Sequence, residues 1–519
     1  MRSQDRYTTG TVTKARNSLA IVVMLGTLAV GTLRAADESW PMFGQNIANT
    51  ASTSETTLST SNVSKLKPKW IFKTGGDVSA RAAVVNGVVY FPDWAGNIWA
   101  VEASNGKKVW THTLSHYGFP SGTISRTSPA VADGKVYIGT QGGWLLAINA
   151  ETGSLVWKSQ PIPPGNVPQI TGSPTVEDGV VYLGLTTDEE GLAENSHYAC
   201  CTTTGNVVAV NANNGTLLWA TPTVPEGYSG AGIWSSGIVV DTSRETVFVT
   251  TGNNYSTPTA AAYVACVAAG GSDGACQSTK DYADSILALN SKTGAVKWGK
   301  RLMQWTATTG TDDWNLACKT SPFTNCPVLT GPDFDFGSGP NEITYKTSKG
   351  SATIIGAGQK SGIYYALDPE TGAELWHTQV GPGIQWGSAS DGTRIYVAVS
   401  NPAGVSYPGG KAGSWAALDP ATGKILWQKP DPNGVTDIGP MAVANGVVYA
   451  PSMAPSDTAP NMFALNAENG DKIWSYPAGS SVNAGATIVS GTVYWGSGYG
   501  RSAGFTSGKK FYAFTENGK

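Results

Sequence analysis

Acids and amides that could bind a cation follow several predicted strands of this 519-residue chain. Glu189 and Glu190 follow the stretch VVYLGL, Asn253 follows TVFVTTG, and Asp312 and Asp313 lie in the loop after AVKWGK. Carboxylate and amide oxygens are ligands that Ca²⁺ prefers. If these loops meet at one place, their residue types would suit a hard cation such as Ca²⁺.

Aromatic and basic residues are expected near the same loops. Lys360 follows the stretch ATIIGAG, and Trp234 and Trp386 stand at or near the starts of predicted strands. Each residue alone has a simpler interpretation, because loop acids are commonly solvated, Asn favours turns and Trp packs in cores. Gathered at one mouth, they would suit a flat anionic cofactor beside the cation.

An 11-residue unit, A-x-x-x-x-x-G-x-x-x-W, provides the framework for these loops. Complete copies occur at residues 100–110, 147–157, 209–219, 288–298, 366–376, 417–427 and 464–474. The chain ends in AFTENGK (513–519), a copy without its Trp strand, and KPKWIFK (67–73) is a Trp strand without its first half. Joined, the two ends complete an eighth unit. The repeat therefore predicts an all-β, eight-bladed β-propeller whose N- and C-terminal strands close the ring and remove its open sheet edges.

Each unit is expected to form four short antiparallel strands. One unit contains SPAVA, KVYIGT, WLLAINA and SLVWK, with an Asp133-Gly134 turn between the first two strands. In such a meander, the loops after the second and fourth strands emerge at one end of the blade and the other turns emerge at the opposite end. The long loops all belong to the first end, so a site is expected there. The repeated Trp is expected to pack between neighbouring blades, where Gly leaves room for it.

Composition limits the possible partners and compartment. Charged residues make up only 14% of the chain and the net charge is -3, so the basic surface that nucleic-acid binding needs is missing. Basic residues precede the apolar run 19–33, and Ala35-Ala36 follows it, which predicts a signal peptide over residues 1–35 and one mature propeller over 36–519. A membrane anchor is the alternative, but the run is about 15 residues long where a span needs about 20. We therefore expect a periplasmic or secreted protein without a stable membrane anchor.

The six cysteines form three local groups, which in an oxidising compartment favour disulfides. The groups are Cys200 with Cys201, Cys266 with Cys276, and Cys318 with Cys326. A zinc site is the competing interpretation, but none of the groups has CxxC spacing. No CxxCH is present, so covalently attached haem is not expected.

The repeats and loops together resemble the pyrroloquinoline quinone (PQQ)-dependent alcohol dehydrogenases, eight-bladed propellers that bind PQQ and Ca²⁺. The stretches YACCTTTGNVVAVNANNG, VTTGNNYS, TDDWNLAC, GPDFDFG and GAGQKSGIYYALDPETG look like the polyvinyl alcohol dehydrogenases of this family in particular. The resemblance spans roughly residues 40–519. The loops carry it more strongly than the repeats, because non-catalytic propellers share the repeats.

The resemblance implies a metal-binding set of three residues. Glu189 and Asn253 match residues of the family that bind Ca²⁺, and Asp312 matches the catalytic Asp and is a further candidate ligand. Glu190 and Asp313 are adjacent competitors for the roles of their neighbours. Asp312 would take the alcohol proton during catalysis.

The resemblance and the expected mouth also give a cofactor-binding set. Its members are Trp234, Thr171, Lys360, Cys200, Cys201, Arg126 and Trp386. Trp234 would provide the ring on which the cofactor lies, and Arg126 would pair with a cofactor carboxylate. Lys360 is also a catalytic candidate, because it would stabilise negative charge that develops on the quinone oxygens.

The implied reaction is oxidation of an alcohol, with polyvinyl alcohol or other secondary alcohols favoured. Some members of the family carry a haem domain that is absent here, so electrons are expected to pass through PQQ to a separate cytochrome c. Two alternatives remain: a quinoprotein that acts on another alcohol or a sugar, and a non-catalytic envelope scaffold that resembles the outer-membrane assembly lipoprotein.

Overall fold

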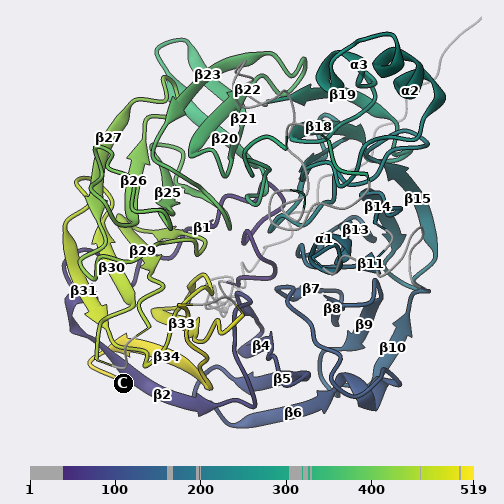
Figure 1. The fold of residues 1–519 in the computed structure, drawn as a ribbon. Helices are drawn as coiled ribbons and strands as arrows, with labels where there is room; N and C mark the ends of the chain where they lie inside the picture. Colours follow the sequence, from purple (N-terminus) through teal and green to yellow (C-terminus); the bar gives the residue numbers. More distant parts are fainter. Residues whose placement is uncertain are drawn as a thin grey trace, which may run out of the picture. The chain divides into compact units, whose positions relative to one another are not determined.

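Within the described residues, eight antiparallel sheets form a ring, as the repeat predicts (Figure 1). The computed structural model describes residues 39–160, 168–194, 198, 200–302, 318, 325–327, 330–455, 458–501 and 504–519. Residues Glu38–Lys519 belong to one compact unit. No helix in the described part of the chain is long and apolar enough to cross a membrane. The predicted signal peptide, residues 1–35, lies outside the described residues.

The first four blades follow one another along the chain. Blade 1 contains β3 (Ala83–Val85), β4 (Val88–Pro92), β5 (Asn97–Glu102) and β6 (Lys108–Thr113). Blade 2 contains β7 (Ala130–Ala132), β8 (Lys135–Gly139), β9 (Leu145–Asn149) and β10 (Leu155–Lys158). Blade 3 contains β12 (Thr175–Glu177), β13 (Val180–Thr187), β14 (Asn206–Asn211) and β15 (Leu217–Pro222). Blade 4 contains β16 (Val239–Asp241), β17 (Thr246–Thr250), β18 (Ser285–Asn290) and β19 (Val296–Arg301).

The other four blades complete the ring. Blade 5 contains β20 (Asn341–Thr347), β21 (Gly350–Gly358), β22 (Ile363–Leu367) and β23 (Glu374–Gln379). Blade 6 contains β24 (Ala389–Ser390), β25 (Ile395–Val399), β26 (Ser414–Leu418) and β27 (Ile425–Pro430). Blade 7 contains β28 (Ala442–Ala444), β29 (Val447–Pro451), β30 (Met462–Asn466) and β31 (Lys472–Tyr476). Blade 8 contains β32 (Thr487–Val489), β33 (Thr492–Gly496), β34 (Lys510–Glu516) and the N-terminal β2 (Leu66–Lys73).

The two ends of the described unit meet in blade 8, which confirms the predicted closure. β2 is antiparallel to β34, with pairing that runs from Leu66 opposite Glu516 to Lys73 opposite Lys510. Figure 1 shows the purple strand β2 beside the yellow strand β34. Two short strands go beyond the repeat: β1 (Ser52–Thr53) pairs in parallel with β28, and β11 (Pro168–Gln169) pairs with β13. The 3₁₀-helices η1 (Val63–Lys65) and η2 (Leu114–Tyr117) flank β2 and β6.

Burial decreases from the inner strands of a blade to its outer strand. Every residue of β17 and β29 is buried, because both faces of these strands are covered by neighbouring blades. The outer strand β15 instead alternates between exposed and partly buried residues from Leu218 onward. A continuous apolar run followed by an alternating strand is therefore the sequence pattern of one blade.

The repeated Trp and Gly form the contact between neighbouring blades, as predicted. The indole N–H of Trp298 donates to the carbonyl of Pro369 in the next blade (3.1 Å). A Cβ at Gly372 would lie only 2.6 Å from Cε3 of the same indole, and Gly372 has a φ of +68°, so glycine meets both a steric and a conformational need. The same bond recurs between blades at Trp70–Ala103, Trp110–Ala150, Trp157–Ala212, Trp219–Ser291, Trp376–Pro420, Trp427–Ala467 and Trp474–Leu66.

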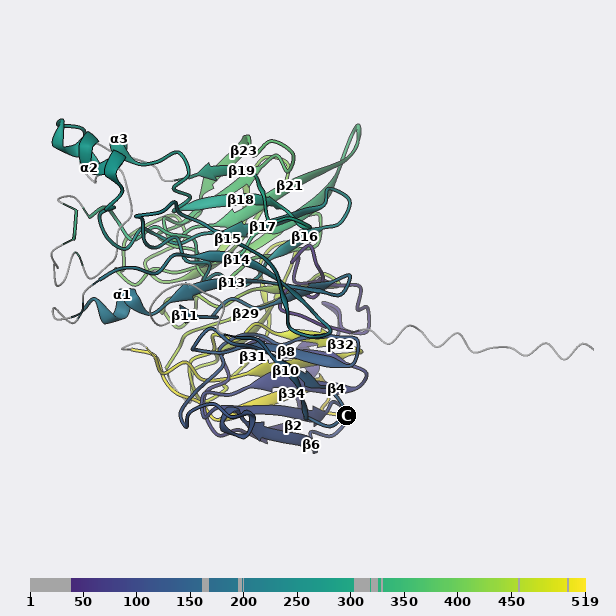
Figure 2. The ribbon, with the colours of Figure 1, turned by 90° about the vertical axis from the view of Figure 1, so that its right-hand side faces the viewer.

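Three short helices lie at one end of the ring (Figure 2). α1 (Glu189–Leu192) lies between β13 and β14, and α2 (Ala261–Ala268) and α3 (Asp273–Cys276) lie between β17 and β18. These are the long loops that the sequence places at one end of the blades. All three predicted disulfides are present, namely Cys200–Cys201, Cys266–Cys276 and Cys318–Cys326.

Candidate active site

A pocket of about 400 Å³ is formed by loops from several blades. It is lined by Arg126, Gln169, Thr171, Thr186, Thr187, Asp188, Glu190, Gly191, Glu194, Trp234, Asn253, Tyr255, Asp333, Asp335, Lys360, Gln385, Trp386, Tyr499 and Arg501. Most of the sequence-predicted site residues that the structure describes are among them. The exceptions are Glu189, Cys200 and Cys201.

Lys360 forms the charged centre of this pocket. It lies just after β21, and its Nζ is 2.6 Å from Asp335 Oδ1 and 2.8 Å from Asp333 Oδ1. The same ammonium lies 4.9 Å from the centre of the Trp234 ring. Burial lowers the pKa of Lys360, but the nearby carboxylates of Asp335, Asp333 and Glu190 raise this pKa well above its usual value. Lys360 is therefore a fixed positive charge over an aromatic face.

Asp335 holds Lys360 and Trp234 in place. Its Oδ2 accepts a hydrogen bond from Trp234 Nε1 (2.6 Å), and its side chain is only 2% exposed. Burial raises the pKa of Asp335 to about 6, although Lys360 opposes this rise. Trp234 meets Trp386 edge to face, with ring centres 5.1 Å apart, and its carbonyl accepts a hydrogen bond from Thr171 Oγ1 (3.3 Å). Trp234 is thus locked from two sides.

Arg126 brings a second positive charge to the pocket. Its guanidinium lies 5.6 Å from the ring of Trp94, 5.9 Å from that of Trp386 and 6.0 Å from that of Tyr499. One Nη donates to the Tyr499 hydroxyl (3.2 Å). Within the described part of the chain, Arg126 Nε and Trp386 Nε1 are buried and have no hydrogen-bond partner. Two buried donors at one wall, one of them charged, would suit the acceptor oxygens of a bound anion.

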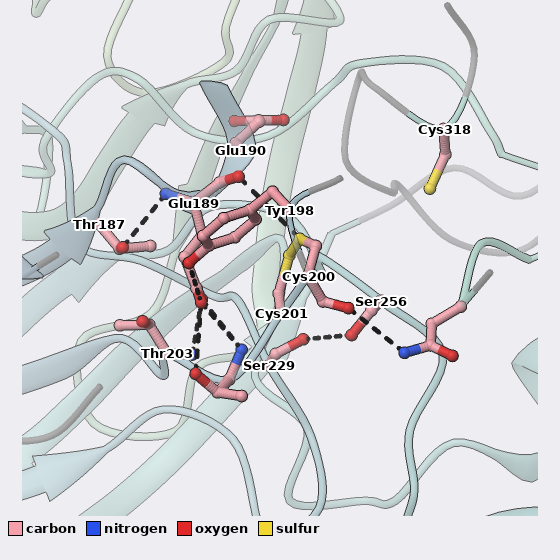
Figure 3. The surroundings of a disulfide bond; sticks show 12 residues. Thr187, Glu189, Glu190, Tyr198, Cys200, Cys201, Thr203, Ser229, Ser256 and Cys318 are labelled. Atoms are coloured by element: carbon pink, nitrogen blue, oxygen red, sulfur yellow. Dashed lines mark hydrogen bonds between the residues drawn. A yellow bond between two sulfur atoms is a disulfide. The ribbon is translucent and has the colours of Figure 1, made fainter. Parts of the chain in front are cut away.

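The adjacent acids Glu189 and Glu190 have different surroundings. Glu189 is 0% exposed, and its carboxylate accepts hydrogen bonds from the Thr203 amide (2.7 Å) and the Tyr198 hydroxyl (2.8 Å) (Figure 3). Glu190 lines the pocket and accepts a hydrogen bond from Asn253 Nδ2 (3.2 Å). Of the two competitors that the sequence leaves open, the structure brings Glu190 into the pocket.

The Cys200–Cys201 disulfide does not line the described pocket. It packs with Ala193 and Tyr198 beside α1, and Cys200 Sγ lies 4.0 Å from the Glu189 carbonyl (Figure 3). Its contacts are therefore with the segment that supplies Glu190.

The predicted acids Asp312 and Asp313 lie outside the described residues. The pocket contains two other acids, Asp333 and Asp335, that the sequence analysis did not predict as site residues. Their stretch GPDFDFG is nevertheless among those that carry the resemblance. The alternation of these two acids with phenylalanines could have indicated their position. Alternate residues of an extended segment share a face, and Phe336 is buried in the core, so the acids lie on the opposite face.

Comparison with known proteins identifies related enzymes. Polyvinylalcohol dehydrogenase from Sphingopyxis sp. (strain 113P3) is 29% identical over 514 residues, which cover 89% of this chain and 74% of that protein. Quinoprotein alcohol dehydrogenase PedH from Pseudomonas putida is 25% identical over 425 residues, which cover 76% of this chain and 63% of that protein. The chain is a relative of the quinoprotein alcohol dehydrogenases.

A solved structure shares the fold of this chain, and a family profile matches part of its sequence. Quinohemoprotein alcohol dehydrogenase from Comamonas testosteroni superposes with a TM-score of 0.67 at 20% identity, over 93% of this chain and 81% of that one. A profile described as outer membrane protein assembly factor BamB matches residues 359–518, less than a third of the chain. The predicted kinship and enzyme class are confirmed, and such kinship implies PQQ and typically a metal ion.

The side chains that line the pocket fit PQQ and a metal ion chemically. The buried donors on Arg126 and Trp386 match an anionic cofactor, and the face of Trp234 matches a planar one. Glu190 and Asn253 supply oxygen ligands for a hard cation. Among the described residues, however, no three His, Cys, Asp or Glu side chains gather as a preformed metal cluster.

Proposed function

We propose that this chain is an exported quinoprotein dehydrogenase that oxidises secondary alcohols, including polyvinyl alcohol, with PQQ and Ca²⁺. One observation supports the proposal most strongly: Lys360 lies over the face of Trp234 and pairs with Asp333 and Asp335, in a pocket that also holds the unpartnered donors of Arg126 and Trp386. The named relatives support the alcohol substrate, since one of them is a polyvinylalcohol dehydrogenase.

Bound PQQ would accept the two electrons of the alcohol, and bound Ca²⁺ would polarise the quinone as a Lewis acid. Arg126 and Trp386 would hold the anionic edge of the cofactor, while Trp234 would support its plane. Glu190 and Asn253 would bind the cation. We therefore assign to Glu190 the metal role that the resemblance implies for Glu189, because the oxygens of Glu189 are already occupied by the Thr203 amide and the Tyr198 hydroxyl.

A carboxylate must take the hydroxyl proton of the alcohol. Asp333 is the described candidate, because it lines the pocket and its side chain is 32% exposed, so a substrate could reach it. Its Oδ1 lies 2.8 Å from Lys360 Nζ, which holds the carboxylate in place. Asp335 is less suited, since it is buried and occupied by Trp234 and Lys360. Asp312 remains the sequence-based alternative.

The side chains at the rim of the pocket control whether a polymer can enter it. Arg501 Nη2 lies 3.6 Å from Asp188 Oδ1, and both side chains are 43% exposed. Such an exposed pair is weak and can separate at little cost. A chain segment of a polymeric alcohol could then enter between these side chains.

Electron transfer would end on a separate cytochrome c in the periplasm. The leader-like residues 1–35 support export.

The deciding experiment is an activity assay with matched variants. The purified protein is loaded with PQQ and Ca²⁺, and dye reduction is followed with polyvinyl alcohol, short secondary alcohols and glucose. We expect turnover with the alcohols, and Asp333→Asn should lower kcat by about 100-fold or more while PQQ stays bound. If Asp312→Asn abolishes turnover and Asp333→Asn does not, the base is Asp312. A preference for glucose would favour the sugar-oxidising alternative.

An envelope scaffold is the second candidate, favoured by the profile match over residues 359–518. A scaffold has no need of the buried Lys360 centre or of the unpartnered donors in the pocket. A protein that binds no PQQ and oxidises no alcohol in the assay above would rule out the dehydrogenase and leave this second candidate.

A further inference from the structure

The loop between β33 and β34 contributes to one wall of the pocket through Tyr499. The structure describes 497–501 and 504–509 of this loop. Tyr499 is 5% exposed, its hydroxyl accepts a hydrogen bond from Arg126 Nη2 (3.2 Å), and its ring centre lies 5.4 Å from that of Trp94. The position of the Arg126 guanidinium therefore depends on the position of this loop.

Asp77 binds this loop at two points. It lies between β2 and β3 and is 4% exposed. Its Oδ2 accepts a hydrogen bond from the Gly500 amide (2.6 Å), and its Oδ1 accepts one from the Gly508 amide (2.9 Å). Because a carboxylate accepts amide bonds more strongly than a neutral oxygen does, the first of these bonds fixes the backbone directly after Tyr499.

The main chain of Asp77 holds a second ring beside Arg126. The Asp77 carbonyl accepts a hydrogen bond from the Trp94 amide (2.9 Å), and Trp94 Nε1 donates to Ser79 Oγ (2.9 Å). The Arg126 guanidinium lies 5.6 Å from the centre of the Trp94 ring. Asp77 therefore connects two of the aromatic residues that surround Arg126, although it does not line the pocket itself.

The carboxylate of Asp77 reaches farther into the loop than the other bonds that anchor it. The Val78 amide donates to the Ser497 carbonyl, and the Thr74 amide donates to the Lys509 carbonyl, both at 3.0 Å. These two bonds hold the ends of the loop next to β33 and β34. Asp77 bonds to residues inside these ends, so it determines where the segment that forms the pocket wall lies.

Gly498 allows the loop to approach this carboxylate closely. A Cβ at Gly498 would lie 2.7 Å from Asp77 Oδ1, and Gly498 has a φ of +106°. A larger residue at this position would therefore move the loop away from Asp77.

We propose that Asp77 is a positioning residue of the cofactor site, which holds the Tyr499 loop and Trp94 so that Arg126 faces the anionic edge of PQQ. This inference rests on the proposed function, in which Arg126 binds that edge. Asp77 would influence PQQ affinity through Tyr499, because Asp77 does not line the pocket. A buried acid with a purely structural role would instead affect stability alone.

A double-mutant cycle on PQQ binding tests this role. Equilibrium dialysis of the Ca²⁺-loaded full-length protein gives the PQQ dissociation constants of Asp77→Asn, Tyr499→Phe and the double variant. Asparagine keeps the shape of the side chain but leaves one of the two amides without an acceptor oxygen. We expect each single substitution to weaken PQQ binding about threefold or more, and the double variant to bind no more weakly than the weaker single variant, because both substitutions act on the same contact.

Glu55→Gln is the matched control for the loss of a buried acid. Glu55 is 1% exposed and accepts a hydrogen bond from the Gly491 amide (3.2 Å) in the turn between β32 and β33, at the other end of the same blade. This variant should lower the thermal midpoint and leave the PQQ dissociation constant unchanged.

Three results would overturn the positioning role: equal PQQ affinity in Asp77→Asn and the unmodified protein, additive losses in the double variant, or an equal loss in Glu55→Gln. If the unmodified protein binds no PQQ, the proposed function fails and this role fails with it, whereas equal binding by Asp77→Asn overturns this role alone. If Asp77→Asn does not fold, hydrogen exchange of the unmodified protein decides. Slower exchange of the Gly500 and Gly508 amides with PQQ bound supports the role, and unchanged exchange overturns it.

Discussion

At the scale of single residues, the pocket depends on which way neighbouring side chains point. Glu189 and Glu190 are adjacent in α1, and successive side chains of a helix diverge by roughly 100°. One carboxylate therefore accepts backbone and hydroxyl donors inside the loop, while the next enters the pocket. Sequence spacing identified this pair but could not choose between its members.

The two acids should respond differently to removal of charge. Glu190→Gln should weaken Ca²⁺ binding in the pocket by about 10-fold or more and reduce alcohol oxidation, with little change in the thermal midpoint. Glu189→Gln should cost about 2 kcal/mol of unfolding free energy, because buried donors lose a charged acceptor. Calcium titration and chemical denaturation measure the two effects. The reverse outcome would return the metal role to Glu189.

A second residue-scale prediction concerns pH. Burial raises the pKa of Glu342 to about 7, and Asp241 adds to the rise, although Arg244 opposes it. A carboxyl with a raised folded-state pKa keeps its proton longer in the folded protein, so stability falls as pH increases from about 4.5 to 7. Glu342→Gln should therefore raise the thermal midpoint at pH 8 and have less effect at pH 5. Differential scanning calorimetry at both pH values measures the difference, and an equal shift would contradict the assignment.

At the scale of elements, one Trp–Gly contact joins each blade to the next. The sequence predicted this contact because its unit recurs at a constant internal spacing. It could not predict β1, β11 or the depth of the pocket, because these depend on pairing between segments distant in the chain. The position of Asp333 was missed for the same reason: its stretch is read as a loop until Lys360, from another segment, is seen beside it.

Two glycines separate the steric part of this contact from its conformational part. Gly372 and Gly87 have φ values of +68° and +74°, but only Gly372 faces an indole, since nothing lies within 4 Å of a Cβ at Gly87. Gly87→Ala should cost about 1 kcal/mol for the left-handed conformation alone. Gly372→Ala should cost a further 1–3 kcal/mol or so, because the new methyl group displaces Trp298. Equal losses of unfolding free energy in urea denaturation would show that the Trp298 indole moves aside at little cost.

At the scale of the whole molecule, we expect ring closure to contribute to stability. β34 lies between β33 and β2, so its removal leaves two unpaired strand edges and opens blade 8. Deletion of residues 510–519 should abolish the cooperative thermal transition and promote aggregation. Deletion of 517–519 alone is the control and should keep the elution volume of the intact protein and a sharp transition. A cooperative transition after the longer deletion would contradict this role of closure.

We propose that this ring holds a quinone cofactor in the pocket around Lys360. Equilibrium dialysis of the Ca²⁺-loaded protein against PQQ tests it most directly. We predict saturable binding of one PQQ per chain, weakened about tenfold or more by Arg126→Gln, because a buried donor and a charge are lost. Absence of saturable binding, or equal affinity in the Arg126→Gln protein, would contradict the claim.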